Sequence, residues 1–145
     1  MKSLLISACL MGFECKYSGG SNALPCETLD ALKKKYKLIP VCPEFAGGLG
    51  VPRDPSEQRD GGVYSLSGRD VTAQYRKGAE VALSLIKRFD CAAALLKERS
   101  PSCGSGEIYD GTFTDKLIYG YGVAAEAIKE NGTELFGESE IEKLL

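Results

Sequence analysis

KSLLISA, residues Lys2 to Ala8, is a short and partly β-branched apolar run that leads directly into the loop-like stretch CLMGFECKYSGGSN. An apolar run of this length followed by glycine-containing sequence predicts a buried strand. Similar runs predict further strands at KLIPV (Lys37–Val41), the short VYSL (Val63–Leu66) and CAAALL (Cys91–Leu96). A last strand is expected near Thr133–Phe136. The chain therefore contains several short strands spread along its length.

Helical patterns separate most of these runs. We expect a first helix over Pro25–Tyr36 and a second from a cap at Asp70 or Thr72 to about Phe89. A third covers Tyr121–Glu130 and ends at the helix stop signal Asn131-Gly132. Strands that alternate with helices predict an α/β fold, here a three-layer Rossmann-like or flavodoxin-like arrangement with a mostly parallel sheet. In such sheets ligands bind beyond the carboxyl ends of the strands.

One long connection, Cys42–Gly62, is rich in proline and glycine. This composition predicts no regular element, and a connection of such length is either disordered or functional.

The composition is ordinary for a globular protein, with 145 residues, 43% hydrophobic residues, 26% charged residues and a formal charge of -2. We expect a single domain over residues 1–145, present as a monomer or small homo-oligomer. Since no basic stripe is present, we expect no nucleic-acid partner. The N-terminal apolar stretch is better interpreted as a strand than as a signal peptide, and no run approaches the length of a membrane helix. We therefore expect a cytoplasmic protein without membrane contact.

The chain has six cysteines and no histidine. Any metal must then depend on thiolates and carboxylates. Cys9, Cys42 and Cys103 each follow a predicted strand and lie in a glycine- or proline-rich loop. The topology therefore brings these three thiols to one edge of the sheet.

Several uses of these thiols remain open from spacing alone. A zinc site normally includes a closely spaced cysteine pair, which is missing, whereas dispersed cysteines suit an iron–sulfur cluster. Three protein ligands to a four-iron cluster would leave one iron open, and Cys15 is the one candidate for a fourth ligand. A cysteine nucleophile or redox pair is the competing interpretation. Cys26 and Cys91 are interpreted as small core residues.

Six motifs together carry a resemblance to a known family. They are ISACLMG, KYSGG, PVCPEFAGGLGVPRDPSE, LLKERSPSCG, IYDGTF and GYGV, at residues 6–12, 16–20, 40–57, 95–104, 108–113 and 120–123. The chain resembles the bacterial DUF523 family, whose thiouracil desulfurase members remove sulfur from thiolated uracils with a four-iron, four-sulfur cluster held by three cysteines. One departure is the stretch Lys16-Tyr17-Ser18-Gly19, where the family pattern has Arg-Tyr-Asp-Gly.

The resemblance implies that Cys9, Cys42 and Cys103 hold the cluster and that its fourth iron is open. It also implies a small thiolated pyrimidine as substrate. Whether protein prepared in air retains the cluster is left open by the sequence. Glu44, two residues after Cys42, is then the expected general acid and base, because a carboxylate in a partly dry site has its pKa raised toward neutrality.

Ser100 and Ser102 flank Pro101 and are expected to hydrogen-bond the substrate carbonyl or position water, with Ser100 favoured. The alternative for both is a turn serine that bonds its own backbone. For Arg53 and Lys97, the alternatives are neutralisation of the cluster and an ordinary surface charge. For Arg53 a salt bridge to a nearby acidic residue is preferred, the candidates being Asp54, Glu57 and Asp60.

A protein of a different class also remains open, namely a noncatalytic sulfur carrier or redox sensor that binds a metal or a persulfide. Action on thiolated tRNA is disfavoured by the absence of a basic surface.

Overall fold

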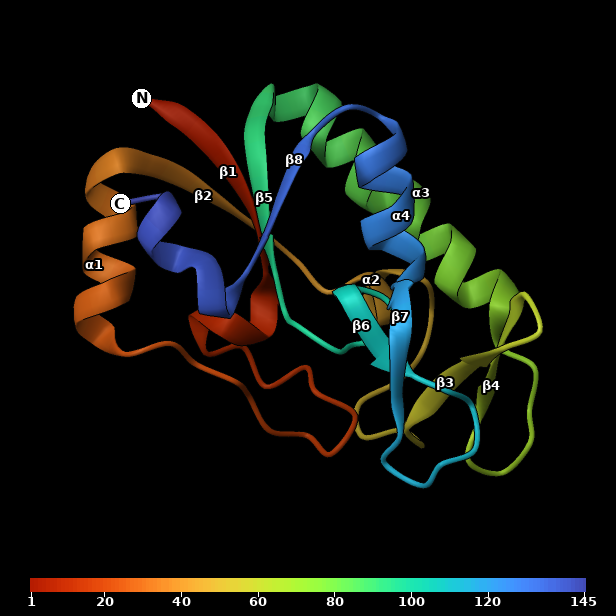
Figure 1. Cartoon of the computed structure of the whole chain (residues 1–145). Coiled ribbons are helices and arrows are strands. Elements are labelled where there is room, and N and C mark those ends of the chain that lie inside the picture. The colour runs from red at the N-terminus through yellow and green to blue at the C-terminus, as the bar shows by residue number, and fades with distance from the viewer.

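A computed structural model describes all residues, 1–145. Its centre is a parallel four-stranded sheet of β1 (Lys2–Ser7), β2 (Tyr36–Val41), β5 (Cys91–Leu96) and β8 (Glu134–Gly137), as Figure 1 shows. The spatial order of the strands is β2-β1-β5-β8. The sheet confirms the strands expected from the apolar runs near these positions.

Helices cover both faces of the sheet. On one face lie α3 (Thr72–Phe89) and α4 (Val123–Glu130), and on the other lie α1 (Cys26–Lys35) and two 3-10 helices, Ala8–Met11 and Glu138–Lys143 (Figure 1). The α/β fold with helices flanking a parallel sheet is confirmed.

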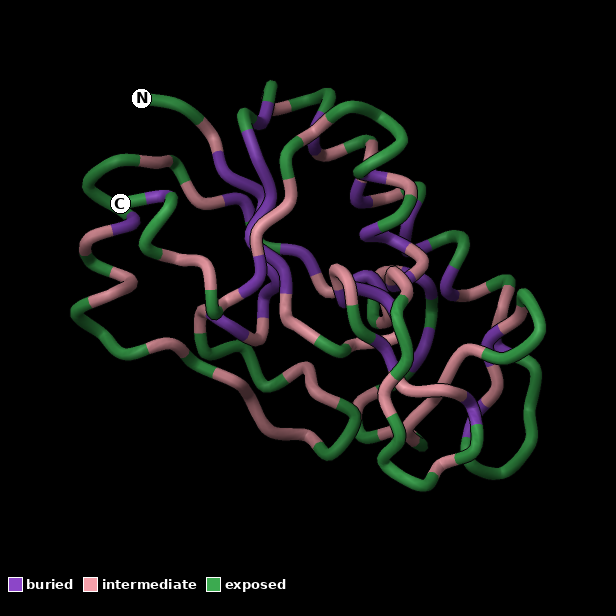
Figure 2. The backbone as a smooth tube through the Cα atoms, in the orientation of Figure 1, coloured by how far each residue is buried: buried purple, intermediate pink, exposed green.

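The alternation of side chains along each strand explains the two cores. Leu5 and Ala94 pack toward α3 and α4, whereas Leu4 and Leu95 pack with Leu32 of α1 on the opposite face. Because both faces are covered, the two central strands, β1 and β5, are almost continuously apolar and run through the most buried part of the molecule (Figure 2).

The long connection contains more regular structure than its composition predicts. It holds the short helix α2 (Pro43–Ala46) and the first strand of a hairpin, β3 (Ser56–Arg59) with β4 (Gly62–Ser65). The expectation of no regular element was wrong because proline at the first helical position is compatible with a helix start. Asp60 and Gly61 both have positive φ, 51° and 78°, which suits a two-residue hairpin turn.

A second hairpin, β6 (Ser105–Tyr109) with β7 (Leu117–Tyr121), is also absent from the sequence-based expectations. It contacts β3, so that both hairpins extend from the same end of the sheet (Figure 1). That end carries the carboxyl termini of the parallel strands.

The strand order places a topological switch point between β1 and β5. The chain leaves β1 toward β2 on one side and later returns to β5 on the other, so the loops after β1 and β5 diverge. Such a divergence opens a crevice for a ligand.

Two glycines fix α2 against α3 beside this crevice. A Cβ atom on Gly47 would lie 1.9 Å from the Gln74 carbonyl oxygen, and one on Gly78 would lie 2.0 Å from the Pro43 carbonyl oxygen. The backbones of α2 and α3 are therefore in direct contact. None of the helices in the chain combines the length and the apolar character that crossing a membrane requires.

Candidate active site

A cavity of about 570 Å³ lies at the carboxyl edge of the sheet and includes the switch point. Its volume is in the range of small-molecule sites. Its walls come from the loops after β1, β2 and β5 and from both hairpins. Cys9, Cys42 and Cys103 all line it, so the structure brings together the three thiols that the strand ends predict.

Two of these thiols sit immediately beyond neighbouring strands. Cys9 lies in the 3-10 helix after β1, where its carbonyl accepts backbone N–H groups from Gly12 and Asn22 at 3.2 and 3.0 Å. Cys42 is the single residue between β2 and α2. Its thiol donates a long hydrogen bond, 3.8 Å, to the carbonyl of Cys15.

Cys103 belongs to a loop that is fixed by α4. The N–H groups of Val123 and Ala124 donate to the carbonyls of Pro101 and Ser102, both at 2.9 Å. The approach is so close that a Cβ atom on Gly122 would lie 2.3 Å from the carbonyl carbon of Ser102. The loop therefore satisfies the free donors of the first turn of α4, and the helix in turn fixes the position of Cys103.

Burial controls the ionisation of the thiols. It raises the pKa of Cys103 well above its ordinary value, and negative charge on Glu44 raises this pKa further. Burial also raises the pKa of Cys9, with smaller contributions from Glu44 and Cys42. The raised pKa values favour the protonated thiols of Cys9 and Cys103, and binding of a metal as thiolates would release these protons.

Cys15 joins the same cavity from the loop after the first 3-10 helix. Burial, followed by the charge of Cys42 and a hydrogen bond with its thiol, raises the pKa of Cys15 to about 12. The sequence gives Cys15 as the one candidate for a fourth ligand, and the structure places it next to Cys42. By contrast, Cys26 is exposed on α1, which corrects its interpretation as a core residue, whereas Cys91 is buried as expected.

Glu44 projects into the cavity from the first turn of α2. Burial raises the pKa of this carboxyl group, and the positive charge of Arg53 opposes the shift. The expected salt-bridge partners of Arg53 were wrong, because its guanidinium lies 3.4 Å from the Glu44 carboxylate. Arg53 reaches this partner because its own loop folds back over the cavity, which local sequence spacing does not reveal.

The two serines next to Pro101 differ sharply in environment. Ser100 lines the cavity, and its hydroxyl oxygen accepts the N–H groups of Ser102 and Cys103 at 3.1 and 3.0 Å. Ser102 does not line the cavity; its side chain is fully buried and its hydroxyl has no hydrogen-bond partner. The structure therefore brings one of the two serines to the site.

Two further polar residues order the wall near Cys9 and Cys103. The buried Ser7 hydroxyl accepts the N–H group of Lys97 at 2.9 Å, and the Lys97 ammonium group lies 2.8 Å from the Glu138 carboxylate. Lys97 thus has a carboxylate partner in the protein itself. The role of Ser7 was missed because a serine inside an apolar strand carries no sequence signal of its own.

The donor set fits an iron–sulfur cluster better than a single ion. No group of three or more cysteine or acidic side chains is spaced closely enough to hold one metal ion. A four-iron cluster binds each cysteine at a different iron, so its ligands stand farther apart than those of a single ion. Three thiols from three different loops line one cavity here, which is compatible with ligands to different irons.

The fold and the site define an α/β protein with converging thiols and one partly buried carboxylate at the carboxyl edge of a parallel sheet. A family model described as 2-thiouracil desulfurase matches residues 4–140. The chain belongs to the 2-thiouracil desulfurase family, as the DUF523 resemblance of its motifs indicated.

The chain is also similar to two proteins over nearly its whole length. The chain is similar to the uncharacterized protein YbbK of Bacillus subtilis (strain 168), with 40% identity over 98% of this chain and 99% of the relative. It is also similar to a solved structure of TudS, a [4Fe-4S]-dependent thiouracil desulfidase, with a TM-score of 0.94 and 40% identity. That alignment covers 99% of this chain and 95% of TudS. The likeness therefore includes the whole fold and both hairpins.

Proposed function

We propose that this protein is a thiouracil desulfurase that converts a thiolated uracil and water into uracil and hydrogen sulfide. The observation that carries the proposal is the convergence of Cys9, Cys42, Cys103 and Glu44 on one cavity in a member of this family. The reaction exchanges a C=S bond for a C=O bond with no net oxidation or reduction.

Cys9, Cys42 and Cys103 are the residues that would hold a four-iron, four-sulfur cluster. When bound, such a cluster would supply an iron without a protein ligand, with the affinity for sulfur that a departing sulfide requires. The chain itself must then orient the ring, exclude excess water and move protons.

Glu44 is the proposed proton carrier. Its carboxyl group lines the cavity, and burial raises its pKa above the ordinary value of a glutamate, which favours a role as general acid and base. In its protonated form Glu44 donates to the thiouracil ring, and as a carboxylate it accepts a proton from the attacking water. Arg53 holds the carboxylate in place.

Ser100 is the proposed hydrogen-bond donor to the substrate. A serine hydroxyl has one donor and two acceptor positions. Both acceptor positions of Ser100 are used by backbone N–H groups, while its O–H proton has no partner in the protein. The proton is therefore available to bond the carbonyl oxygen of the ring.

Anaerobic reconstitution of the protein with iron and sulfide tests the proposal. We expect a brown protein that converts 2-thiouracil into uracil and releases one sulfide for each uracil formed. Protein with a full cluster that retains sulfur without forming uracil would instead be a sulfur carrier, and the proposal would be wrong.

A further inference from the structure

The loop that joins β6 and β7, residues 110–116, has an unusual backbone. Gly111, Phe113 and Asp115 all have positive φ, at 94°, 57° and 61°. For a bulky residue such as phenylalanine this conformation is a rare outlier that costs free energy, so other contacts must enforce it. Asp110 stabilises the turn, since its carboxylate accepts the N–H and O–H groups of Thr112 at 2.9 and 2.6 Å.

Glu57 of the neighbouring hairpin holds this loop. A single carboxylate oxygen of Glu57 accepts the N–H groups of Gly111 and Phe113 at 3.0 and 3.1 Å. A Cβ atom on Gly111 would lie 2.6 Å from the Gln58 carbonyl oxygen, so the loop backbone rests directly on β3. The side chain of Glu57 thus maintains the left-handed conformation of Phe113.

This arrangement places the aromatic ring of Phe113 at the cavity. Four aromatic residues line the cavity: Tyr17, Tyr75, Tyr109 and Phe113. The Tyr75 side chain is part of a hydrophobic cluster with Leu49 and Val63 and is buried there. Tyr109 is held within the β6–β7 ladder opposite Leu117.

Phe113 differs from these tyrosines because a carboxylate anchor fixes it in an unfavourable backbone conformation while its side chain stays partly accessible. An apolar ring in this position suits the face of a planar heterocycle, which prefers offset stacking or edge contact with an aromatic side chain.

We propose that Phe113 contacts the pyrimidine ring of the substrate and that Glu57 is the positioning residue that sets its orientation. The inference rests on the proposed function for the identity of the ring. It assigns ring binding to the hairpin loop, separately from the thiols and from Glu44.

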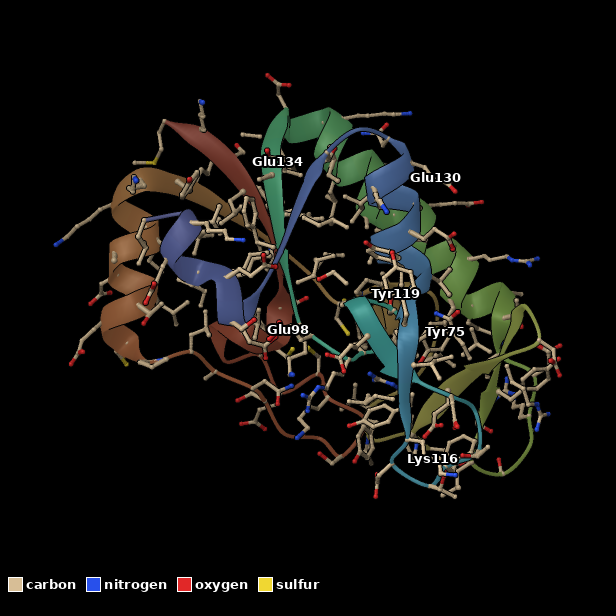
Figure 3. All side chains as sticks on the ribbon, viewed as in Figure 1. Tyr75, Glu98, Lys116, Tyr119, Glu130 and Glu134 are labelled. Atoms are coloured by element: carbon tan, nitrogen blue, oxygen red, sulfur yellow. The ribbon has the colours of Figure 1, made fainter.

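Phe113→Leu tests the contact, because leucine keeps an apolar side chain but removes the aromatic face. We expect the KM for 2-thiouracil to rise about threefold to tenfold, the range expected for loss of one aromatic pair, with kcat changed less than twofold. Phe113→Tyr, which keeps the ring, should retain the wild-type KM. The matched control is Tyr119→Leu, an exposed aromatic residue on β7 that does not line the cavity and lies away from the loop end marked by Lys116 in Figure 3.

Two variants of Glu57 test the positioning role. Glu57→Ala removes the acceptor and should raise KM as much as Phe113→Leu does, whereas Glu57→Gln keeps an oxygen acceptor and should restore most of the wild-type KM. The absorbance of the cluster should be the same in all variants. An unchanged KM in Phe113→Leu, or a Glu57→Gln variant as impaired as Glu57→Ala, would overturn the inference.

Binding of uracil to the cluster-free protein, measured by calorimetry, separates this inference from the proposed function. Wild-type protein should bind uracil, and Phe113→Leu should weaken that binding by a similar factor. A wild-type protein that binds uracil but never desulfurates 2-thiouracil would remove the proposed function and leave the ring contact standing. Equal binding by the wild-type protein and Phe113→Leu, or by neither, would overturn the ring contact even if desulfuration occurs.

Discussion

One nitrogen of Arg53, Nη2, lies 3.4 Å from the Glu44 carboxylate and 3.0 Å from the carbonyl oxygen of Cys15. The Arg53 and Glu44 side chains are only 10% and 14% exposed. A second guanidinium nitrogen donates to the Gly50 carbonyl at 3.2 Å. Arg53 therefore links the Cys15 loop to the helix that carries Glu44, at the edge of the cavity.

Arg53→Gln should destabilise the cluster-free protein by about 1–3 kcal/mol, because it leaves a partly buried carboxylate without its partner. Urea unfolding monitored by circular dichroism measures this free energy. The matched control is Arg59→Gln, which removes an exposed guanidinium stacked on Tyr64 and should cost less than about 0.5 kcal/mol. Equal stability of Arg53→Gln and wild-type protein would show that the link carries no net energy.

Glu44→Gln should retain the cluster spectrum, since no thiol is lost, but lower the turnover of 2-thiouracil about 10²- to 10⁴-fold. The variant should also lose the part of the pH–rate profile that arises from this carboxyl group. Steady-state kinetics on reconstituted protein at several pH values checks both effects. Wild-type turnover would remove Glu44 from the mechanism, and loss of the spectrum would make it a structural residue or a ligand.

Replacement of Cys9, Cys42 or Cys103 by serine should in each case abolish the cluster absorbance and the activity. Cys91→Ser should retain both and lose about 1–3 kcal/mol of stability, because it places a hydroxyl at a buried position. Cys26→Ser should retain both without loss of stability, because Cys26 is exposed. Iron content and visible absorbance after anaerobic reconstitution are the measurements.

Cys15→Ser is the decisive variant for the number of ligands. If three thiols hold the cluster, this variant should bind a full complement of iron even though Cys15 lies beside Cys42. Loss of the cluster in Cys15→Ser would establish four protein ligands and exclude the open iron.

Ser100→Ala and Ser102→Ala should behave in opposite ways. Ser100→Ala leaves the N–H groups of Ser102 and Cys103 without their acceptor and should cost about 1–3 kcal/mol as well as activity. Ser102→Ala removes a buried hydroxyl that has no partner and should leave stability unchanged or increase it. Thermal unfolding and the desulfurase assay test both, and an inactive but stable Ser102→Ala would assign Ser102 a direct role in the reaction.

Most of the fold follows from the sequence because apolar runs and helical periodicity are local signals. β1, β2, β5 and β8 are short apolar segments, and α1, α3 and α4 have an apolar face. The β6–β7 hairpin is different. Apart from the buried Ile108, its strand residues are partly buried or exposed, with Ile118 and Tyr119 exposed, so no regular hydrophobic alternation marks it.

The convergence of the three thiols was also predictable, since it follows from strand ends in a parallel sheet. The partners of side chains across loops were not. Arg53 lies nine positions after Glu44, beyond a helix end and a turn, and Phe113 lies 56 positions after Glu57. Contacts of this kind depend on how the loops fold over the cavity, and no local pattern specifies that.

The backbone contact between α2 and α3, made at Gly47 and Gly78, has a mechanical consequence. A contact between side chains absorbs small displacements, because the side chains rotate, whereas two touching backbones have no such freedom. We therefore expect α2, which carries Glu44 and begins directly after Cys42, to move together with the 18-residue helix α3. The spacing between this thiol and this carboxylate should then vary little when the surrounding loops move.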